Sequence, residues 1–120
     1  IRLLVVNIHA INFVSIESYE RQIKQITEKI SMHSGPAIFI GDFNNWNNSR
    51  MKLLKKLTSD VGLVHYDFPR DNSDPSKYSK LDHIFVRGLK VHKHGQLSQF
   101  STSDHYPIFV ELEYSETQAD

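Results

Sequence analysis

The chain has 120 residues, of which 39% are hydrophobic and 23% are charged, as expected for one ordinary globular domain spanning residues 1–120. Its 14 basic and 14 acidic side chains cancel, which excludes a global field for holding nucleic acid or an anionic membrane. No apolar run approaches the ~20 residues of a membrane span, and the absence of cysteine excludes disulfides and thiolate chemistry.

The first half of the chain alternates apolar runs with helical periodicity. Residues 3–8 are apolar at nearly every position, which predicts an interior strand covered on both faces. Residues 15–32 form a predicted helix, residues 37–40 a second buried strand, and residues 49–59 a second helix. The inward positions that we expect on the two helices are Tyr19, Ile23, Ile26, Ile30, Met51, Leu54 and Leu57.

The last third of the chain is predicted to be sheet, with strands at residues 81–86, 90–99 and 108–114. The third of these alternates cleanly, so that Ile108, Val110, Leu112 and Tyr114 should point inward and the intervening residues outward. Strands that alternate with helices and are followed by further strands predict an α/β fold, with a mixed β-sheet and helices on one face.

Polar residues of the kinds that bind metal or move protons stand at the ends of these strands. Taken singly, each has a plain structural explanation as a cap, a turn former or a satisfied edge histidine. Because strand ends on one edge of a sheet converge, residues distant in sequence can line one cleft. The sequence therefore predicts one site made of Asn7, His9, Asp42, Asn44, Asp82, Asp104 and His105.

The segments "GDFN", "LDHIFVRGL" and "SDHYPIFVEL", in this order after "VVNIHAINF", resemble the C-terminal half of the endonuclease/exonuclease/phosphatase superfamily of DNase I-like phosphoesterases. The resemblance covers nearly the whole chain and is strongest to a bacterial branch in which "VVNIHA" and a "GDFN" followed by Trp also occur. It implies one half of a four-layer α/β sandwich, and an enzyme that cleaves phosphodiesters with Mg²⁺ or Mn²⁺.

The resemblance also implies a role for each residue of the predicted site. Asp42 would orient or deprotonate the attacking water, and Asn44 would donate to the phosphate oxygens. Asp104 would bind the metal ion, His105 would contact the scissile phosphate, and Asp82 would hold His105 in orientation. His9 would lie near the phosphate or the leaving group, and Asn7 would support the phosphate site.

These residue types suit phosphoester hydrolysis independently of any family. Charge that redistributes around an anionic phosphate must be neutralised, and oxygen ligands suit Mg²⁺ or Mn²⁺. A histidine beside a carboxylate stays protonated more readily and can then donate to phosphate. An amide two residues after Asp42 donates without competing for the metal.

The superfamily has an N-terminal half that this chain lacks, and that half supplies an Asn and a metal-binding Glu. The resemblance therefore implies that Asp104 alone is a firm metal ligand, so we expect the isolated chain to be inactive or nearly so. We also expect an apolar sheet face left uncovered, and self-association through it. The sequence names no compartment, and we favour the cytoplasm.

The sequence is also compatible with other functions and substrates. The substrate is a phosphoester, for which nucleic acid is one candidate and a phospholipid or inositol phosphate another. A non-catalytic interaction module on the same fold is the rival from another class, and a third reading makes every polar residue a turn former. Arg50 with Lys52, Lys55 and Lys56 is interpreted as a solvated basic face, and His83 as structural.

Overall fold

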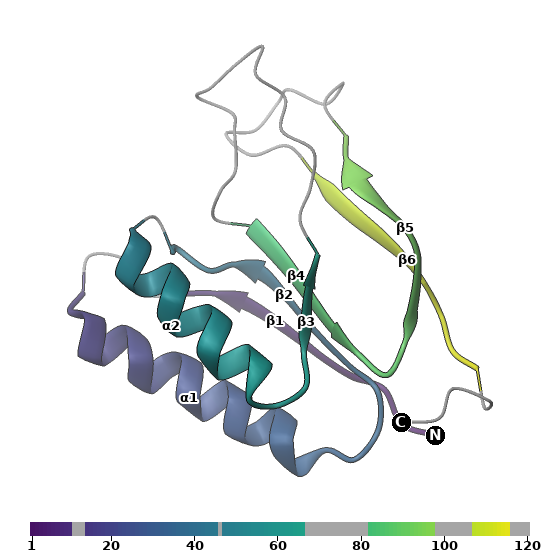
Figure 1. Cartoon of the computed structure of the whole chain (residues 1–120), viewed down its shortest axis with the longest axis horizontal. Helices are drawn as coiled ribbons and strands as arrows, with labels where there is room; N and C mark the ends of the chain where they lie inside the picture. The colour runs from purple at the N-terminus through teal and green to yellow at the C-terminus, as the bar shows by residue number, and fades with distance from the viewer. Residues whose placement is uncertain (11–13, 46, 67–81, 98–106, 116–120) are drawn as a thin grey trace.

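The computed structural model describes residues 1–10, 14–45, 47–66, 82–97 and 107–115 (Figure 1). Within these residues there are two helices and six strands, one strand more than predicted. Strands and helices alternate at first, and the chain then continues as a run of strands, as predicted. In chain order they are β1 (Leu4–His9), α1 (Ile16–Met32), β2 (Ala37–Asp42), α2 (Asn48–Ser59), β3 (Val64–Tyr66), β4 (Asp82–Arg87), β5 (Lys90–Gln96) and β6 (Ile108–Glu113).

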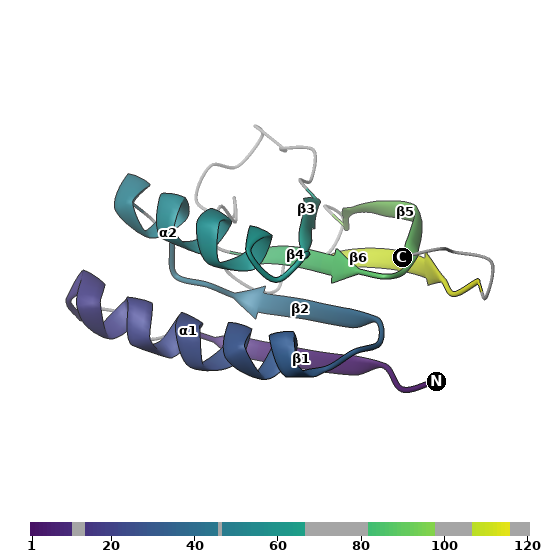
Figure 2. The same cartoon turned by 60° about the horizontal axis from the view of Figure 1, so that its bottom comes forward.

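The strands of the described residues form two sheets. The larger one has the order β1-β2-β4-β3, with β1 and β2 parallel and the other pairs antiparallel. The α/β class with a mixed sheet is therefore confirmed. Strands β5 and β6 pair with each other in a separate antiparallel sheet beside it (Figures 1 and 2), and the three-residue strand β3 was not predicted.

Both helices cover the same face of the larger sheet. Residues from α1, including Tyr19 and Ile23, and Leu54 from α2 are fully buried against Phe39 of β2 and Phe85 of β4. The rings of Phe39, Phe43 and Phe85 meet at centroid distances of 4.7 to 6.2 Å. This aromatic cluster fixes the sheet against the helices at the end where β2 leads into the "GDFN" turn.

Each helix begins at a side chain that caps its first turn. Ser15 accepts from the Ser18 amide before α1, and Asn47 accepts from the Arg50 amide before α2. The predicted inward stripes are confirmed, although Ile26 and Met51 are half-buried where the others are buried. No helix of the described part is both long enough and apolar enough to cross a bilayer.

The two faces of β1 differ. Leu4, Val6 and Ile8 turn toward the helices, whereas Leu3 and Val5 remain 51% and 55% exposed. The prediction of an interior strand covered on both faces is wrong in the described structure, because β1 lies at the edge of its sheet and packs on one side only. A continuous apolar run does not distinguish these two situations.

Strand β6 departs from its predicted alternation at one end. Glu111 and Glu113 are exposed as expected, but Tyr114 lies beyond the last paired residue and is 44% exposed. Phe109, predicted to point outward, is half-buried beside Gly95 of β5, which leaves room for its ring. The prediction for Tyr114 is wrong because its strand ends one residue earlier.

Candidate active site

Three of the predicted site residues lie in one row across the larger sheet. His9 at the end of β1 is the partner of Asp42 at the end of β2, and Asp42 is the partner of Asp82 at the start of β4. The parallel pair and the antiparallel pair thus bring these side chains to the same end of the sheet. Asn7 is exposed and stands two residues before His9 on β1, paired with Ile40.

His9 and Asp42 approach each other within the range of an ion pair. Nε2 of His9 lies 3.8 Å from Oδ2 of Asp42, and their side chains are 81% and 22% exposed. The other carboxylate oxygen, Oδ1, accepts a hydrogen bond of 3.0 Å from the backbone amide of Asn44. One oxygen of Asp42 is therefore held by its own turn, while the other faces His9.

Asn44 ties the ends of β1 and β2 together. Its side-chain amide donates to the carbonyl oxygen of Ala10 at 2.6 Å, its residue is 5% exposed, and its backbone has φ = 46°. A positive φ is uncommon for any residue other than glycine, although asparagine adopts it more readily than most. This hydrogen bond leaves the second amide hydrogen for other acceptors, so donation to phosphate stays a prediction.

Gly41 allows β1 and β2 to approach closely just before the row. It has φ = 142°, and a Cβ placed on it would lie 2.0 Å from the carbonyl oxygen of Ile8. Only glycine fits a position that combines this φ with such a contact. The glycine of "GDFN" is therefore required by the backbone geometry that delivers Asp42 to the site.

The turn after β2 is held from the helix side by two buried side chains. The hydroxyl of Tyr19 on α1 donates to the carbonyl oxygen of Phe43 at 2.6 Å. The guanidinium of Arg50 on α2 donates to the carbonyl oxygen of Asn44 at 3.0 Å and lies 4.5 Å from the centre of the Tyr19 ring. Burial raises the pKa of Tyr19, an effect that Arg50 opposes and Asp42 reinforces.

Arg50 therefore corrects the interpretation of α2 as presenting one basic face. Lys52, Lys55 and Lys56 are exposed, but Arg50 is 2% exposed and packs inside the molecule. Its position four residues before Leu54 and seven before Leu57 places it on the apolar stripe of the helix. The spacing of Arg50 from Leu54 and Leu57 thus indicated an inward position, whereas the charge of its side chain indicated an exposed one.

A pair of histidines holds the next residue of the turn. Nε2 of His65 lies 2.9 Å from Nδ1 of His83, and Nε2 of His83 lies 2.9 Å from Oδ1 of Asn45. Because the Asn45 oxygen only accepts, a neutral His83 donates to it from Nε2 and accepts at Nδ1 from Nε2 of His65. This arrangement, with His83 8% exposed, supports its interpretation as a structural residue.

Two of the predicted site residues, Asp104 and His105, lie outside the described residues. Within the described part, no three His, Asp or Glu side chains come close enough together to hold a metal ion. Asp42 and Asp82 are directly paired residues of two antiparallel strands, so their side chains are neighbours on one face of the sheet. Carboxylate oxygens suit Mg²⁺ or Mn²⁺, and the carboxylate that the resemblance makes the metal ligand, Asp104, lies outside the described residues.

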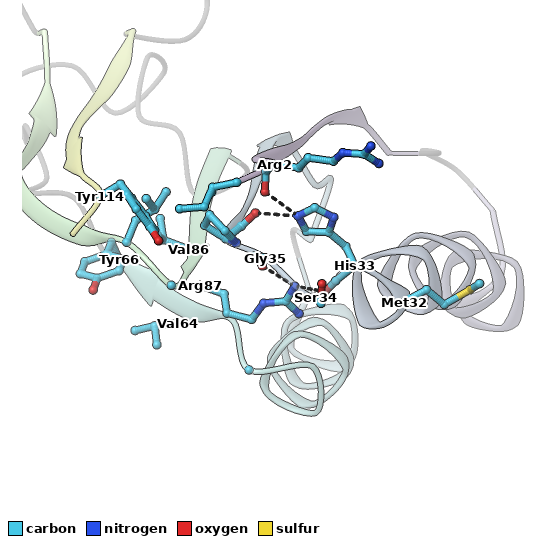
Figure 3. A pocket seen from close by; sticks show the side chains of 15 residues that line it. Arg2, Met32, His33, Ser34, Gly35, Val64, Tyr66, Val86, Arg87 and Tyr114 are labelled. Carbon is cyan, nitrogen blue, oxygen red and sulfur yellow. Dashed lines mark hydrogen bonds between the residues drawn. The ribbon is translucent and has the colours of Figure 1, made fainter. Parts of the chain in front are cut away.

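A separate hollow lies at the other end of the sheet (Figure 3). It is lined by the end of α1, the segment that leads into β2, part of β3 and the end of β4, and it contains none of the predicted site residues. Arg87 lies there with its guanidinium donating to carbonyl oxygens of His33, Gly35 and Val61. This guanidinium closes the end of α1 onto the sheet.

The fold and the row of residues define an α/β domain whose polar site lies at the ends of its strands. The sequence model of the Endonuclease/Exonuclease/phosphatase family matches residues 5–105, and the chain belongs to this family. This confirms the resemblance carried by the "GDFN", "LDHIFVRGL" and "SDHYPIFVEL" segments. The family comprises hydrolases of the phosphoesterase and nuclease type, which typically depend on a divalent metal.

Curated relatives include UPF0294 proteins of bacteria. One from Yersinia enterocolitica is 39% identical over 112 residues, which make up 92% of this chain and 43% of that protein. Another, from Klebsiella pneumoniae, is 40% identical over 111 residues, or 92% of this chain and 42% of that protein. The chain therefore spans less than half the length of the curated relatives it matches.

Solved structures share the fold at lower identity. An endonuclease/exonuclease/phosphatase family protein from Bacteroides thetaiotaomicron superposes with a TM-score of 0.69 at 23% identity, covering 93% of this chain and 49% of that one. A mannosyl-6-phosphatase from the same organism gives a TM-score of 0.67 at 23% identity, covering 92% and 50%. The fold of this chain is thus about half of each of these larger domains.

Proposed function

We propose that this chain is part of a divalent-metal-dependent phosphoesterase that cleaves phosphodiesters by in-line attack of water. The observation that carries the proposal is the row of His9, Asp42 and Asp82, placed at one end of the sheet in a member of this family. Two neighbouring carboxylates beside a histidine suit a site that neutralises and moves charge.

In this proposal each described residue has a defined task. Asp42, with Oδ1 held by the Asn44 amide, uses its second carboxylate oxygen to orient the attacking water or accept its proton. His9, exposed at the edge, donates to the phosphate or the leaving group when it is protonated. Asn44 lends its free amide hydrogen to a phosphate oxygen, and Asn7 borders the phosphate on the same strand as His9.

The residues outside the described part complete the assignment. Asp104 holds the metal ion, and His105, oriented by Asp82, contacts the scissile phosphate. A bound Mg²⁺ or Mn²⁺ supplies charge neutralisation at the phosphate oxygens. Because the chain spans less than half of its relatives, we propose that residues 1–120 alone turn over poorly.

The exposed face of β1 supports a second part of the proposal, that residues 1–120 alone self-associate. Val5 is 55% exposed and pairs with Ile38, which is only half-buried. These side chains lie on the face of the sheet opposite the helices. A second copy placed over them would remove this apolar surface from water.

The proposed activity is tested in the full natural chain that contains these residues. Hydrolysis of plasmid DNA, RNA, a phospholipid and a sugar phosphate is measured with EDTA, and again after Mg²⁺ or Mn²⁺ is returned. Asp82→Asn should lower kcat on the order of 10²-fold or more. Asp60→Asn is the matched control, since Asp60 is exposed and pairs only with Lys56 among the described residues. Turnover in EDTA, or an unchanged rate for Asp82→Asn, contradicts the proposal.

A further inference from the structure

The most deeply buried charged side chain of the described part belongs to Arg50, on the first turn of α2. At 2% exposure its guanidinium has left bulk water, which is costly unless its donors are satisfied. A leucine in the same place would extend the apolar stripe that Leu54 and Leu57 already form. The presence of an arginine at this buried position therefore has to be explained by the groups that its guanidinium binds.

The two ends of the guanidinium fork reach two different segments. Nη1 donates to the carbonyl oxygen of Asn44 at 3.0 Å, and Nη2 donates to that of Val14 at 2.9 Å. Val14 belongs to the connection that leaves β1, and Asn44 to the turn that leaves β2. Arg50 thus joins the two connections that carry the chain away from His9 and Asp42. A single lysine ammonium lacks the planar fork that spans both carbonyls.

The contact with Asn44 leads directly to the carboxylate of Asp42. Arg50 fixes the carbonyl of Asn44, whose backbone has φ = 46°, and the amide of Asn44 donates to Oδ1 of Asp42 at 3.0 Å. The two groups lie on adjacent peptide planes that meet at the Cα of Asn44, so holding the carbonyl limits, through φ and ψ of Asn44, where the amide can lie. The planar Tyr19 ring 4.5 Å from the guanidinium, with its hydroxyl on the Phe43 carbonyl, limits how far Arg50 itself shifts.

We propose that Arg50 is a positioning residue, which orients the Asp42 carboxylate through Asn44 without touching the substrate. The inference rests on the proposed function for its effect on the rate, but its geometric part stands on the hydrogen bonds alone. A displacement of about 1 Å at a reacting group lowers a rate by as much as about 10²-fold. Loss of the Arg50 fork should therefore appear mainly in kcat.

Arg87 offers a matched control at the opposite end of the sheet. It too holds backbone carbonyls with its guanidinium, those of His33, Gly35 and Val61, at 2.6 to 3.0 Å. Figure 3 shows Arg87 with His33 and Gly35 at the hollow, which contains none of the predicted site residues. An arginine that only stabilises the fold should behave as Arg87 does.

The test compares Arg50→Lys, Arg50→Met and Arg87→Lys in the full natural chain, at a temperature where circular dichroism shows each to be folded. We expect Arg50→Lys to lower kcat about 10-fold and Arg50→Met about 100-fold, with KM within about threefold of the parent. Arg87→Lys should lower the melting temperature and leave kcat unchanged. Equal losses of kcat in Arg50→Lys and Arg87→Lys, or a change confined to KM, would overturn the proposal.

A second readout separates this inference from the proposed function. The backbone amide resonance of Asn44 and the carboxyl carbon resonance of Asp42 should shift in Arg50→Lys and stay in place in Arg87→Lys. If the parent hydrolyses no phosphoester and these shifts still occur, the proposed function fails and the positioning role stands. If neither resonance moves in Arg50→Lys, the positioning role fails whatever the activity. Should Arg50→Met not fold, the comparison of Arg50→Lys with Arg87→Lys carries the test alone.

Discussion

The replacement of Gly41 by alanine should damage the molecule more than any ordinary glycine substitution on a strand. The new Cβ would lie 2.0 Å from the carbonyl oxygen of Ile8, so β1 and β2 must separate at their ends. The φ of 142° adds backbone strain of about 1–3 kcal/mol for a residue with a Cβ. Relief of the overlap costs about 1–3 kcal/mol more, as overpacking does in a core.

The expected loss of unfolding free energy is thus about 2–6 kcal/mol, and we take about 3 kcal/mol as the working value. For a chain of 120 residues, each kcal/mol lowers the melting temperature by roughly 4 °C. Gly41→Ala should therefore melt about 12 °C below the parent, as followed by circular dichroism at constant protein concentration.

Gly62→Ala is the control for this experiment. Gly62 also has a positive φ, of 80°, but its new Cβ would meet only the flexible Arg87 side chain, at 3.3 Å. It should cost about 1–2 kcal/mol, from the left-handed backbone alone. If Gly41→Ala melts at the same temperature as Gly62→Ala, the close approach of β1 and β2 does not exist as described.

Three further predictions concern the surroundings of the site and the surface. Tyr19→Phe should cost about 1–3 kcal/mol in urea denaturation, because the Phe43 carbonyl loses a buried donor, while Tyr114→Phe on the surface should cost nothing measurable. The pKa of Glu113 is lowered by its hydrogen bond from His92 and by the charge of that histidine. The stabilisation from this ion pair is therefore present above the ordinary pKa of Glu and is lost as the pH falls through the lowered pKa of Glu113. Glu113→Gln should therefore melt slightly below the parent at neutral pH and match it in stronger acid, and a difference that grows in acid would contradict this. Val5→Lys should abolish the self-association of residues 1–120, measured by sedimentation at micromolar concentration. Met32→Lys is the control and should not, because Met32 is 85% exposed at the end of α1. A monomeric parent would contradict self-association through the exposed face of β1.

The sequence was sufficient to predict the elements that depend on local periodicity. The apolar stripe through Tyr19, Ile23 and Ile30 gave α1 to within a residue at its start, and the run before "GDFN" gave β2. The gathering of polar residues at strand ends followed from the general geometry of sheets, and His9, Asp42 and Asp82 do lie in one row. Their chemical roles depend on contacts that stay predictions.

Long-range contacts account for what the sequence did not predict. The strand of residues 3–8 looked interior because its residues are apolar, and only the strand order places it at an edge. Arg50 was grouped with its neighbouring lysines because its two carbonyl partners come from segments 6 and 36 residues away. Strand β3 has only three residues, too few for any period to be visible.

The role of Gly41 in the "GDFN" motif also could not be predicted from the sequence alone. In the sequence it is a turn former before Asp42, and any turn would accept it. The structure gives it a second constraint, the carbonyl of Ile8 on the neighbouring strand. That contact exists only once β1 and β2 are paired, so the reason for this glycine lies in the tertiary structure.

The central claim is that His9, Asp42, Asn44 and Asp82 border one metal-dependent site together with Asp104 and His105. Mn²⁺ is paramagnetic, so its titration into the ¹⁵N-labelled full natural chain, followed by NMR, reports directly which residues surround the ion. We predict selective broadening of the resonances of these six residues, and its reversal by EDTA. Broadening centred on the exposed Glu111 and Glu113 of β6, with the row of His9, Asp42 and Asp82 unaffected, would contradict the account.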